Sequence, residues 1–242
     1  MLEKSTEERR ERRHTSTQYE QELTELRQKL LRMGGYVEEM IFRTMQALVE
    51  RDSELARQMI EFDHQINRLE VEIDELCLHI LALRQPTASD LRFLSTAMKI
   101  VTDLERIADL GTSIAERAIE LNEEPQLKPY IDLPRMAEAA QKMVHDCLDA
   151  FVERNVELAE SVLRHDHVVD ELNEQIFREL LTFMLEDPHN ITRAMRLMFV
   201  SKALERIGDH ATNIAEMVIF MVKGKIIRHM GKNAPPDTTP SA

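Results

Sequence analysis

The chain has 242 residues, of which 31 are lysine or arginine, 44 are aspartate or glutamate, six are glycine and eight are proline. Because glycine and proline are the usual turn residues, their shortage excludes β-sandwiches, barrels and propellers and favours an all-α fold. The net charge of −13 argues against a general electrostatic attraction to nucleic acid or to an anionic membrane surface.

The charge pattern also argues against a membrane span and against secretion. The longest stretch without a charged residue, Leu76–Leu83, is far shorter than the roughly 20 apolar residues that a membrane-spanning helix needs. The first residues have no apolar core of the kind that a secretory signal contains. Cys77 and Cys147 lie within helical patterns, so a reduced, cytoplasmic protein is expected.

Prolines and N-cap residues divide the chain into six predicted helices. In chain order they cover residues 17–50, 54–85, 88–122, 135–153, 156–186 and 190–228. Residues 1–16 are predicted to form a flexible N-terminal arm, residues 125–134 a proline-containing linker, and residues 231–242 a disordered tail.

Two internal repeats define the architecture. The sequence of Leu104–Glu116 returns as Leu204–Glu216 with nine of thirteen positions identical, and Val49–Ala56 returns as Val152–Ala159. The chain is therefore predicted to form two tandem, pseudo-symmetric three-helix bundles, over residues 17–124 and 135–230, related by a pseudo-twofold axis.

The repeated segment carries acidic side chains beside its apolar stripe. On a helical wheel the pair Glu105 and Asp109 points in one direction, and a matching pair follows 100 residues later. The second helix of each unit carries a comparable pair of oxygen-bearing side chains, so two facing helices would present four such groups. The eight residues are Asp63, Asn67, Glu105, Asp109, Asp166, Asp170, Glu205 and Asp209.

Carboxylates one helical turn apart repel each other unless a cation lies between them. A cluster of carboxylates with an amide and no cysteine favours Mg²⁺, Mn²⁺ or iron, with Zn²⁺ as a further option. The alternative is a solvated face in which Arg106 or Arg206 neutralises the acidic groups. Four pairs in register across two repeats make a metal site as well supported as that alternative, and both stay open at this point.

The spacing of Glu61 and His64 resembles that of ferritin-like di-iron proteins, which need the motif on two helices of one bundle. The position that matches Glu61 in the second copy is Arg164. A carboxylate-bridged metalloenzyme or metal store is therefore kept only as an alternative, with His64 and His167 as candidate outer partners of the carboxylates.

The remaining histidines and methionines are assigned from their context. His145, His165, His189, His210 and His229 have no repeated context and are predicted to lie on the surface. Four methionines at helical spacing are predicted to fill the core, with an adaptable binding groove as the alternative. They are Met195, Met198, Met217 and Met221. No glycine-rich phosphate loop is present, so any phosphate sensing is expected to act through metal or a partner.

Several motifs together resemble one family. They are the repeated LERIAD and LERIGD segments followed by SIAE and NIAE, the RQPTASDLR run of Arg84–Arg92 and the MGGYVE segment of Met33–Glu38. With the two-copy layout, they make residues 17–230 similar to the PhoU family of bacterial regulators of phosphate uptake. The resemblance implies two three-helix domains, frequent homodimers and multinuclear metal clusters held by the acidic pairs. Asn67 departs from the acidic pattern and lowers the charge expected of the first-domain site.

The resemblance also implies a function that spacing alone does not. It implies a non-enzymatic, cytoplasmic negative regulator of the phosphate-starvation (Pho) response. Such a protein would connect the ATPase PstB of the Pst phosphate ABC transporter to the sensor histidine kinase PhoR. Association with the inner membrane would then go through these partners.

Overall fold

The computed structural model describes residues 2–224, with side chains described from residue 17 onward. Within this range the chain forms six α-helices, one short 3₁₀ helix and no strand, which confirms the predicted all-α class. The helices are α1 (Leu2–Glu50), α2 (Ser53–Arg84), α3 (Ala88–Asn122), α4 (Asp132–Glu153), α5 (Val156–Glu186), η1 (Pro188–Asn190) and α6 (Ile191–Lys223).

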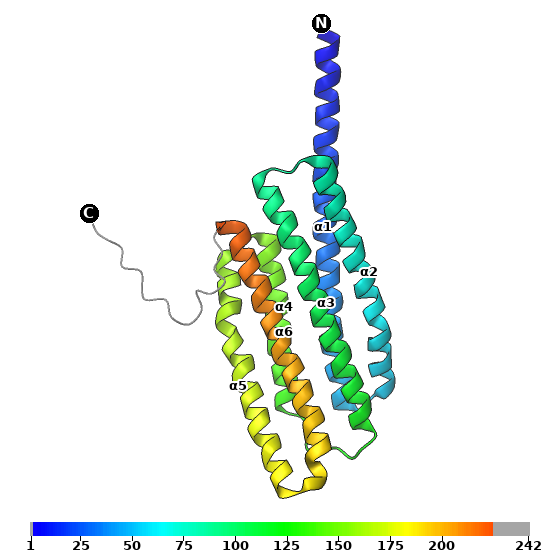
Figure 1. The fold of residues 1–242 in the computed structure, drawn as a ribbon, viewed down its shortest axis with the longest axis vertical. Helices are drawn as coiled ribbons and strands as arrows, with labels where there is room; N and C mark the ends of the chain where they lie inside the picture. The colour runs from blue at the N-terminus through cyan, green and yellow to red at the C-terminus, as the bar shows by residue number, and fades with distance from the viewer. Residues whose placement is uncertain (1, 225–242) are drawn as a thin grey trace, which may run out of the picture.

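Two helices begin earlier than predicted. Helix α1 begins at Leu2 and projects beyond the bundle (Figure 1). Residues 2–16, predicted to form a flexible arm, are therefore part of this helix. This segment contains strong helix formers and neither glycine nor proline, so nothing in it ends the helix. Helix α4 begins at Asp132 rather than at residue 135. Pro134 is tolerated there because the first helical turn has no intrahelical use for its missing N–H.

The last helix ends earlier than predicted. Gly224 adopts a left-handed conformation with φ 68°, and its N–H donates to the carbonyl oxygen of Phe220 at 2.8 Å. This is a common way for a glycine to end a helix, so α6 stops at Lys223 instead of running to residue 228. The predicted disordered tail, residues 231–242, lies outside the described residues.

The two repeats have the same backbone corner between their first and second helices. The side chain of Asp52 accepts hydrogen bonds from the backbone N–H groups of the first turn of α2, and Asn155 does the same for α5. The residues just before these caps, Arg51 and Arg154, both adopt left-handed conformations, with φ 59° and 53°. The same corner is therefore built twice, as the sequence repeat predicts.

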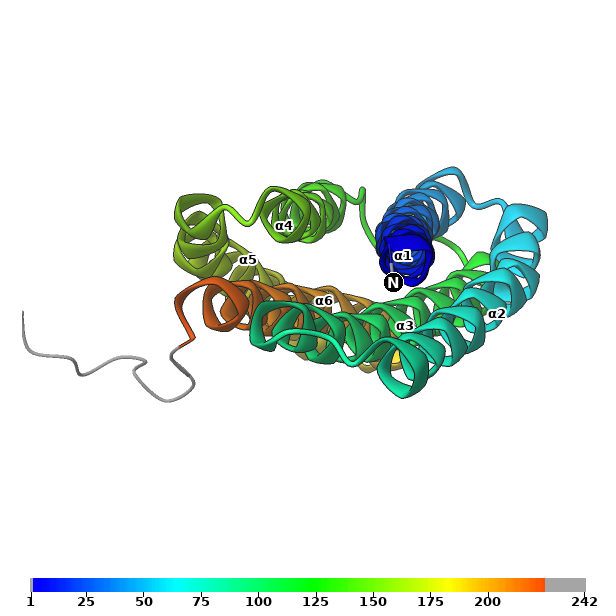
Figure 2. The ribbon, with the colours of Figure 1, turned by 90° about the horizontal axis from the view of Figure 1, so that it is seen from above.

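The helices form two layers (Figure 2). Helices α1 and α4 lie side by side in one layer, and α2, α3, α6 and α5 lie in that order in the other. Helices α3 and α6 run antiparallel at the centre of the second layer (Figure 1). The pseudo-twofold axis passes between them, so the predicted pair of pseudo-symmetric bundles is confirmed.

Polar contacts fix the register of α3 against α6. Asp103 pairs with His210 at 2.7 Å, and Glu120 pairs with Arg196 at 2.9 Å. In this antiparallel register the two pairs place residues 106–108 of α3 opposite residues 206–208 of α6, so the end of the repeated LERI segment lies at the pseudo-twofold axis. The prediction that His210 lies on the surface is wrong, because only 19% of its side chain is exposed.

One continuous apolar core joins the two bundles. The rings of Phe93 and Phe151 stack between them with centroids 5.3 Å apart. Met217 and Met221 are buried in this core, as predicted for them. Since apolar burial is the main favourable term in folding, the bundles are expected to unfold together. None of the helices within residues 2–224 has an apolar stretch long enough to cross a bilayer.

Helix α1 packs tightly against α4 at Gly34, where an added Cβ would lie 2.2 Å from Cδ1 of Leu148. Gly35 has nothing within 4 Å of the same position. We expect Gly34→Ala to be about 1–3 kcal/mol less stable to denaturant unfolding than Gly35→Ala, because it overpacks a buried contact. Gly35→Ala should be as stable as the parent or more stable by up to about 1 kcal/mol, because alanine favours the helix.

Adding Leu148→Ala to Gly34→Ala tests the cause of this difference. The smaller side chain should reduce the penalty of Gly34→Ala when the two changes are compared in a double-mutant cycle. Equal stability of the two glycine variants would contradict the described packing of α1 against α4.

Candidate functional site

The first acidic pair on α3 faces α2 because the neighbouring apolar stripe of α3 is buried. Leu104, Ile107 and Ala108 are fully buried in the core, which turns Glu105 toward α2. Burial raises the pKa of Glu105, and the negative charges of Asp109 and Asp63 raise it further. The structure therefore brings the predicted residues of α2 and α3 into electrostatic contact.

Asn67 changes the charge balance at this site. Its Nδ2 donates to Oδ2 of Asp63 at 2.7 Å, and this hydrogen bond lowers the pKa of Asp63, where a second carboxylate would raise it. Burial still raises the pKa of Asp63, and Asp109 adds to that rise. The amide nitrogen of Asn67 is thus a hydrogen-bond donor to Asp63, and its amide oxygen is left as a candidate metal ligand.

Three oxygen atoms of the first acidic stripe and its neighbouring threonine are buried without a hydrogen-bond partner among the described residues. They are Oδ1 of Asp63, Oδ1 of Asn67 and Oγ1 of Thr112. A buried, unsatisfied polar atom costs about 1–3 kcal/mol, so a ligand that these oxygens could bind would be stabilising. Carboxylate, amide and hydroxyl oxygens are the donors that Mg²⁺ and Mn²⁺ prefer. The donor types therefore fit the predicted metal.

A side-chain cation occupies the same region. Arg106 lies 3.5 Å from Oε2 of Glu105 and 3.5 Å from Oδ2 of Asp109, as the solvated-face alternative expects. Within the described residues, no three Asp, Glu, His or Cys side chains are grouped so that they could hold one ion. Metal binding at this stripe stays a prediction, and it requires that Arg106 moves away from the carboxylates.

The second acidic stripe lies between α5 and α6. Gly208 of α6 lies next to α5, since an added Cβ there would be in ordinary contact with Oδ1 of Asp166 at 3.5 Å. Partial burial raises the pKa of Asp209, and Glu205 and Asp170 raise it further. The four predicted residues of this stripe therefore also come together.

The counter-cation of the second stripe differs from the predicted one. The Nζ of Lys202 lies 2.6 Å from the carboxylate of Glu205. Arg206 makes no ion pair among the described residues, although its counterpart Arg106 contacts both acidic groups of the first stripe. Lysine one turn earlier on α6 reaches the carboxylate instead, so Arg206 was the wrong candidate.

Two acidic residues that the sequence did not point to, Glu70 and Asp74, extend the first stripe along α2. Burial raises the pKa of Glu70, and the charges of Asp74 and Asp109 raise it further. Both residues lie on the face of Asp63 and Asn67, at intervals of three and four residues that keep side chains in one line. The second repeat breaks this line with Asn173 and Phe177.

The histidine arrangement gives no support to a ferritin-like centre. His64 is exposed and lies 3.8 Å from Oε2 of Glu61. His167 contacts the carbonyl oxygen of Arg164 at 2.6 Å through Nδ1. Both polar contacts stay within one turn of the same helix, so neither histidine orients a carboxylate of the stripes.

Comparison with known proteins decides the family. The model of the PhoU domain matches residues 30–118 and, a second time, residues 133–218. The chain belongs to the PhoU family. The two matched segments correspond to the two three-helix repeats, so the family to which the sequence motifs pointed is confirmed.

Named relatives and solved structures agree with this assignment. The phosphate-specific transport system accessory protein PhoU homolog of Pseudomonas putida is 47% identical over 219 residues, which cover 90% of this chain and 86% of the relative. The accessory protein PhoU of Escherichia coli is 38% identical over 219 residues, covering 90% and 91%. The crystal structure of PhoU from Pseudomonas aeruginosa superposes with a TM-score of 0.82 at 46% identity, covering 86% of this chain and all of that one.

The raised pKa of Asp63 yields a test of the stripe without metal. Because the folded state raises this pKa, ionised Asp63 destabilises the fold at neutral pH, and the penalty disappears as the pH falls through the raised value. In metal-free protein Asp63→Asn should therefore melt higher than the parent at pH 7. Asn67 can still donate to the new carboxamide oxygen. The difference should shrink as the pH is lowered toward about 4.

The matched control is Glu61→Gln on the same helix, where the side chain is exposed. It should change stability by less than about 0.5 kcal/mol at either pH. Thermal unfolding followed by circular dichroism measures both variants. A melting temperature for Asp63→Asn at or below that of the parent at pH 7 would contradict the described burial of Asp63.

Proposed function

We propose that this PhoU-family chain is a negative regulator of phosphate uptake and of the phosphate-starvation response. It acts in the cytoplasm, without enzymatic activity, as a homodimeric adaptor between the Pst transporter ATPase PstB and the sensor kinase PhoR. The observation that carries the proposal is the match of both repeats to the PhoU domain. The names of the relatives, accessory proteins of phosphate-specific transport systems, support the link to phosphate.

The architecture suits an adaptor. The antiparallel packing of α3 against α6 makes one body from two related bundles, so two similar surfaces are held in a fixed relation. The repeats differ in their side chains, which allows each surface to select a different partner. Because the core is continuous, a ligand that changes the packing of α2 against α3, or of α5 against α6, would also change the packing of the other bundle.

The acidic stripes are the proposed place for such a ligand. Asp63, Asn67, Glu105 and Asp109 would hold one metal centre, and Asp166, Asp170, Glu205 and Asp209 the other. The metal would supply the positive charge that like-charged neighbours lack. In its absence Arg106 and Lys202 neutralise these carboxylates. Exchange of a side-chain cation for a metal ion is thus the proposed local change, and phosphate reaches the protein through this metal or through a partner.

The proposal is tested in a strain that lacks its own PhoU gene and carries a reporter of the phosphate-starvation response. The parent chain should restore repression at high phosphate. A variant with Glu105→Ala, Asp109→Ala, Glu205→Ala and Asp209→Ala should leave the reporter at the level of the deletion strain, because both stripes lose their carboxylates. Binding of each purified variant to PstB and to the cytoplasmic part of PhoR should be measured in parallel.

The matched control removes four exposed glutamates outside the stripes, with Glu54→Ala, Glu61→Ala, Glu157→Ala and Glu171→Ala. It should repress like the parent. Failure of the parent chain to repress the reporter would contradict the proposed regulation. Full repression by the stripe variant would remove the stripes from the mechanism.

A further inference from the structure

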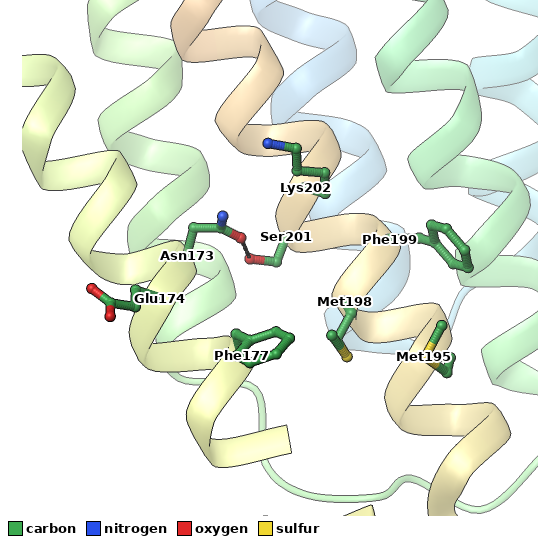
Figure 3. Close-up of a pocket in the computed structure, with 8 residues that line it drawn as sticks. All are labelled: Asn173, Glu174, Phe177, Met195, Met198, Phe199, Ser201 and Lys202. Carbon is green, nitrogen blue, oxygen red and sulfur yellow. Dashed lines mark hydrogen bonds between the residues drawn. The ribbon is translucent and has the colours of Figure 1, made fainter. Parts of the chain in front are cut away.

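A second surface, next to the second acidic stripe, is an open apolar groove between α5 and α6. Its cavity has a volume of about 420 Å³ (Figure 3). The apolar lining consists of Phe177, Met195, Met198 and Phe199. Phe177 and Phe199 are 47% and 58% exposed, which is a large exposure for two phenylalanines on one surface. Of the four methionines predicted to fill the core, Met195 and Met198 therefore line a groove, as the alternative expected.

Two polar side chains that line the groove are paired with each other. The hydroxyl of Ser201 donates to Oδ1 of Asn173 at 2.6 Å (Figure 3). Glu174 lies at the edge, where it is paired with Arg178. The groove is thus a surface suited to apolar side chains, with charged groups only at its rim.

The first repeat shows that the fold does not need this apolar surface. The position equivalent to Phe177 is Asp74, and the position equivalent to Phe199 is Lys99. The same helix pair therefore packs with charged residues at these two places. Apolar residues that are exposed and not required for packing mark an interaction surface.

A basic depression adjoins the groove between α3 and α6. It has a volume of about 180 Å³, shares Phe199 and Lys202 with the groove, and is also lined by Arg117 and Arg206. The guanidinium of Arg117 lies 5.8 Å from the centroid of the Phe199 ring. Arg117 and Lys202 have acidic partners, whereas Arg206 makes no ion pair among the described residues. In a chain of net charge −13, this gathering of cations favours an acidic ligand.

We infer that the groove and the basic depression together bind an amphipathic, acidic helix of a partner protein. Its apolar side chains would lie against Phe177, Met198 and Phe199, and its carboxylates would lie against Lys202 and Arg206. An open apolar groove between two helices is a common binding site for such a helix. The inference deepens the adaptor role proposed above and rests on it for the protein nature of the partner.

Other occupants fit the charges less well. A flat anionic membrane would have to approach the whole acidic face, including Asp170 and Asp209 on the same pair of helices, whereas a single helix contacts only the groove and the cations beside it. The C-terminal segment of this chain carries Lys225, Arg228 and Lys232, which repel the basic depression. These two occupants and a second copy of the chain are decided by the experiments below.

The test selects peptides on the full-length chain from a displayed library of helices with randomised surfaces. Enriched peptides should combine apolar residues at i, i+4 and i+7 with Asp or Glu at one end. Affinity of a labelled, selected peptide is then measured by fluorescence anisotropy. Phe177→Asp and Phe199→Lys, which copy the first repeat, should each weaken binding by about tenfold or more.

A charge reversal tests the basic depression. Arg206→Glu should lower the affinity for the acidic peptide and raise the affinity for a version of the same peptide with Lys in place of its acidic residues. The control, Val71→Asp, changes an exposed apolar residue of the first repeat and should leave affinity unchanged. Circular dichroism and melting temperature establish that each variant is folded. The inference would be overturned if no peptide is enriched or if basic peptides are enriched. It would also be overturned if Phe177→Asp, Phe199→Lys and Arg206→Glu leave the affinity for the selected peptide unchanged.

Two measurements decide between the remaining occupants. Cosedimentation with vesicles of phosphatidylcholine and phosphatidylglycerol should show no binding that depends on Phe199. Light scattering should give the same mass for the parent and for Phe199→Lys. Vesicle binding lost in this variant, or a change of its mass, would assign the groove to a membrane or to a second copy and overturn the inference. If peptide selection fails while the parent chain still represses the reporter, the groove inference fails and the proposed regulation stands.

Discussion

The antiparallel packing of α3 against α6 is the constraint on which the rest of the structure depends. Each of these helices contacts its own bundle with a buried stripe, meets its counterpart at the pseudo-twofold axis, and turns its acidic pair toward the next helix of the layer. The Asp103–His210 and Glu120–Arg196 pairs fix the register. Because three faces of each helix are in contact with other helices, few of its positions can change. This explains why the LERI segment is the part of the chain that repeats most closely.

Outside that segment the repeats differ, and the differences separate the surfaces of the molecule. Along α2 the first repeat extends its acidic stripe with Glu70 and Asp74, where α5 has Asn173 and Phe177. The first bundle is therefore the more acidic on this face, and the second carries an apolar groove beside the cations of α6, including Arg206. A pseudo-symmetric fold thus presents two unlike faces, which is what an adaptor between two proteins requires.

Sequence patterns predicted the helices, the repeat and the family because these depend on local periodicity and on residue identity. They missed the end of α6, where the apolar run continues but Gly224 adopts a left-handed conformation. The mostly buried position of His210 and the choice of Lys202 rather than Arg206 as counter-cation depend on the neighbouring helices. The groove at Phe177 was hidden because a helical wheel does not show which face stays uncovered.

Elemental analysis of protein purified without chelator tests whether the two acidic stripes bind cations, as proposed. The parent and a variant with Glu105, Asp109, Glu205 and Asp209 all changed to alanine are measured together, with melting temperatures before and after Mg²⁺, Mn²⁺ or iron is supplied. We expect bound metal and a metal-dependent rise in melting temperature in the parent, both lost in the variant. Absence of metal from the parent under all conditions, with a variant at least as stable, would rule out metal binding at the stripes.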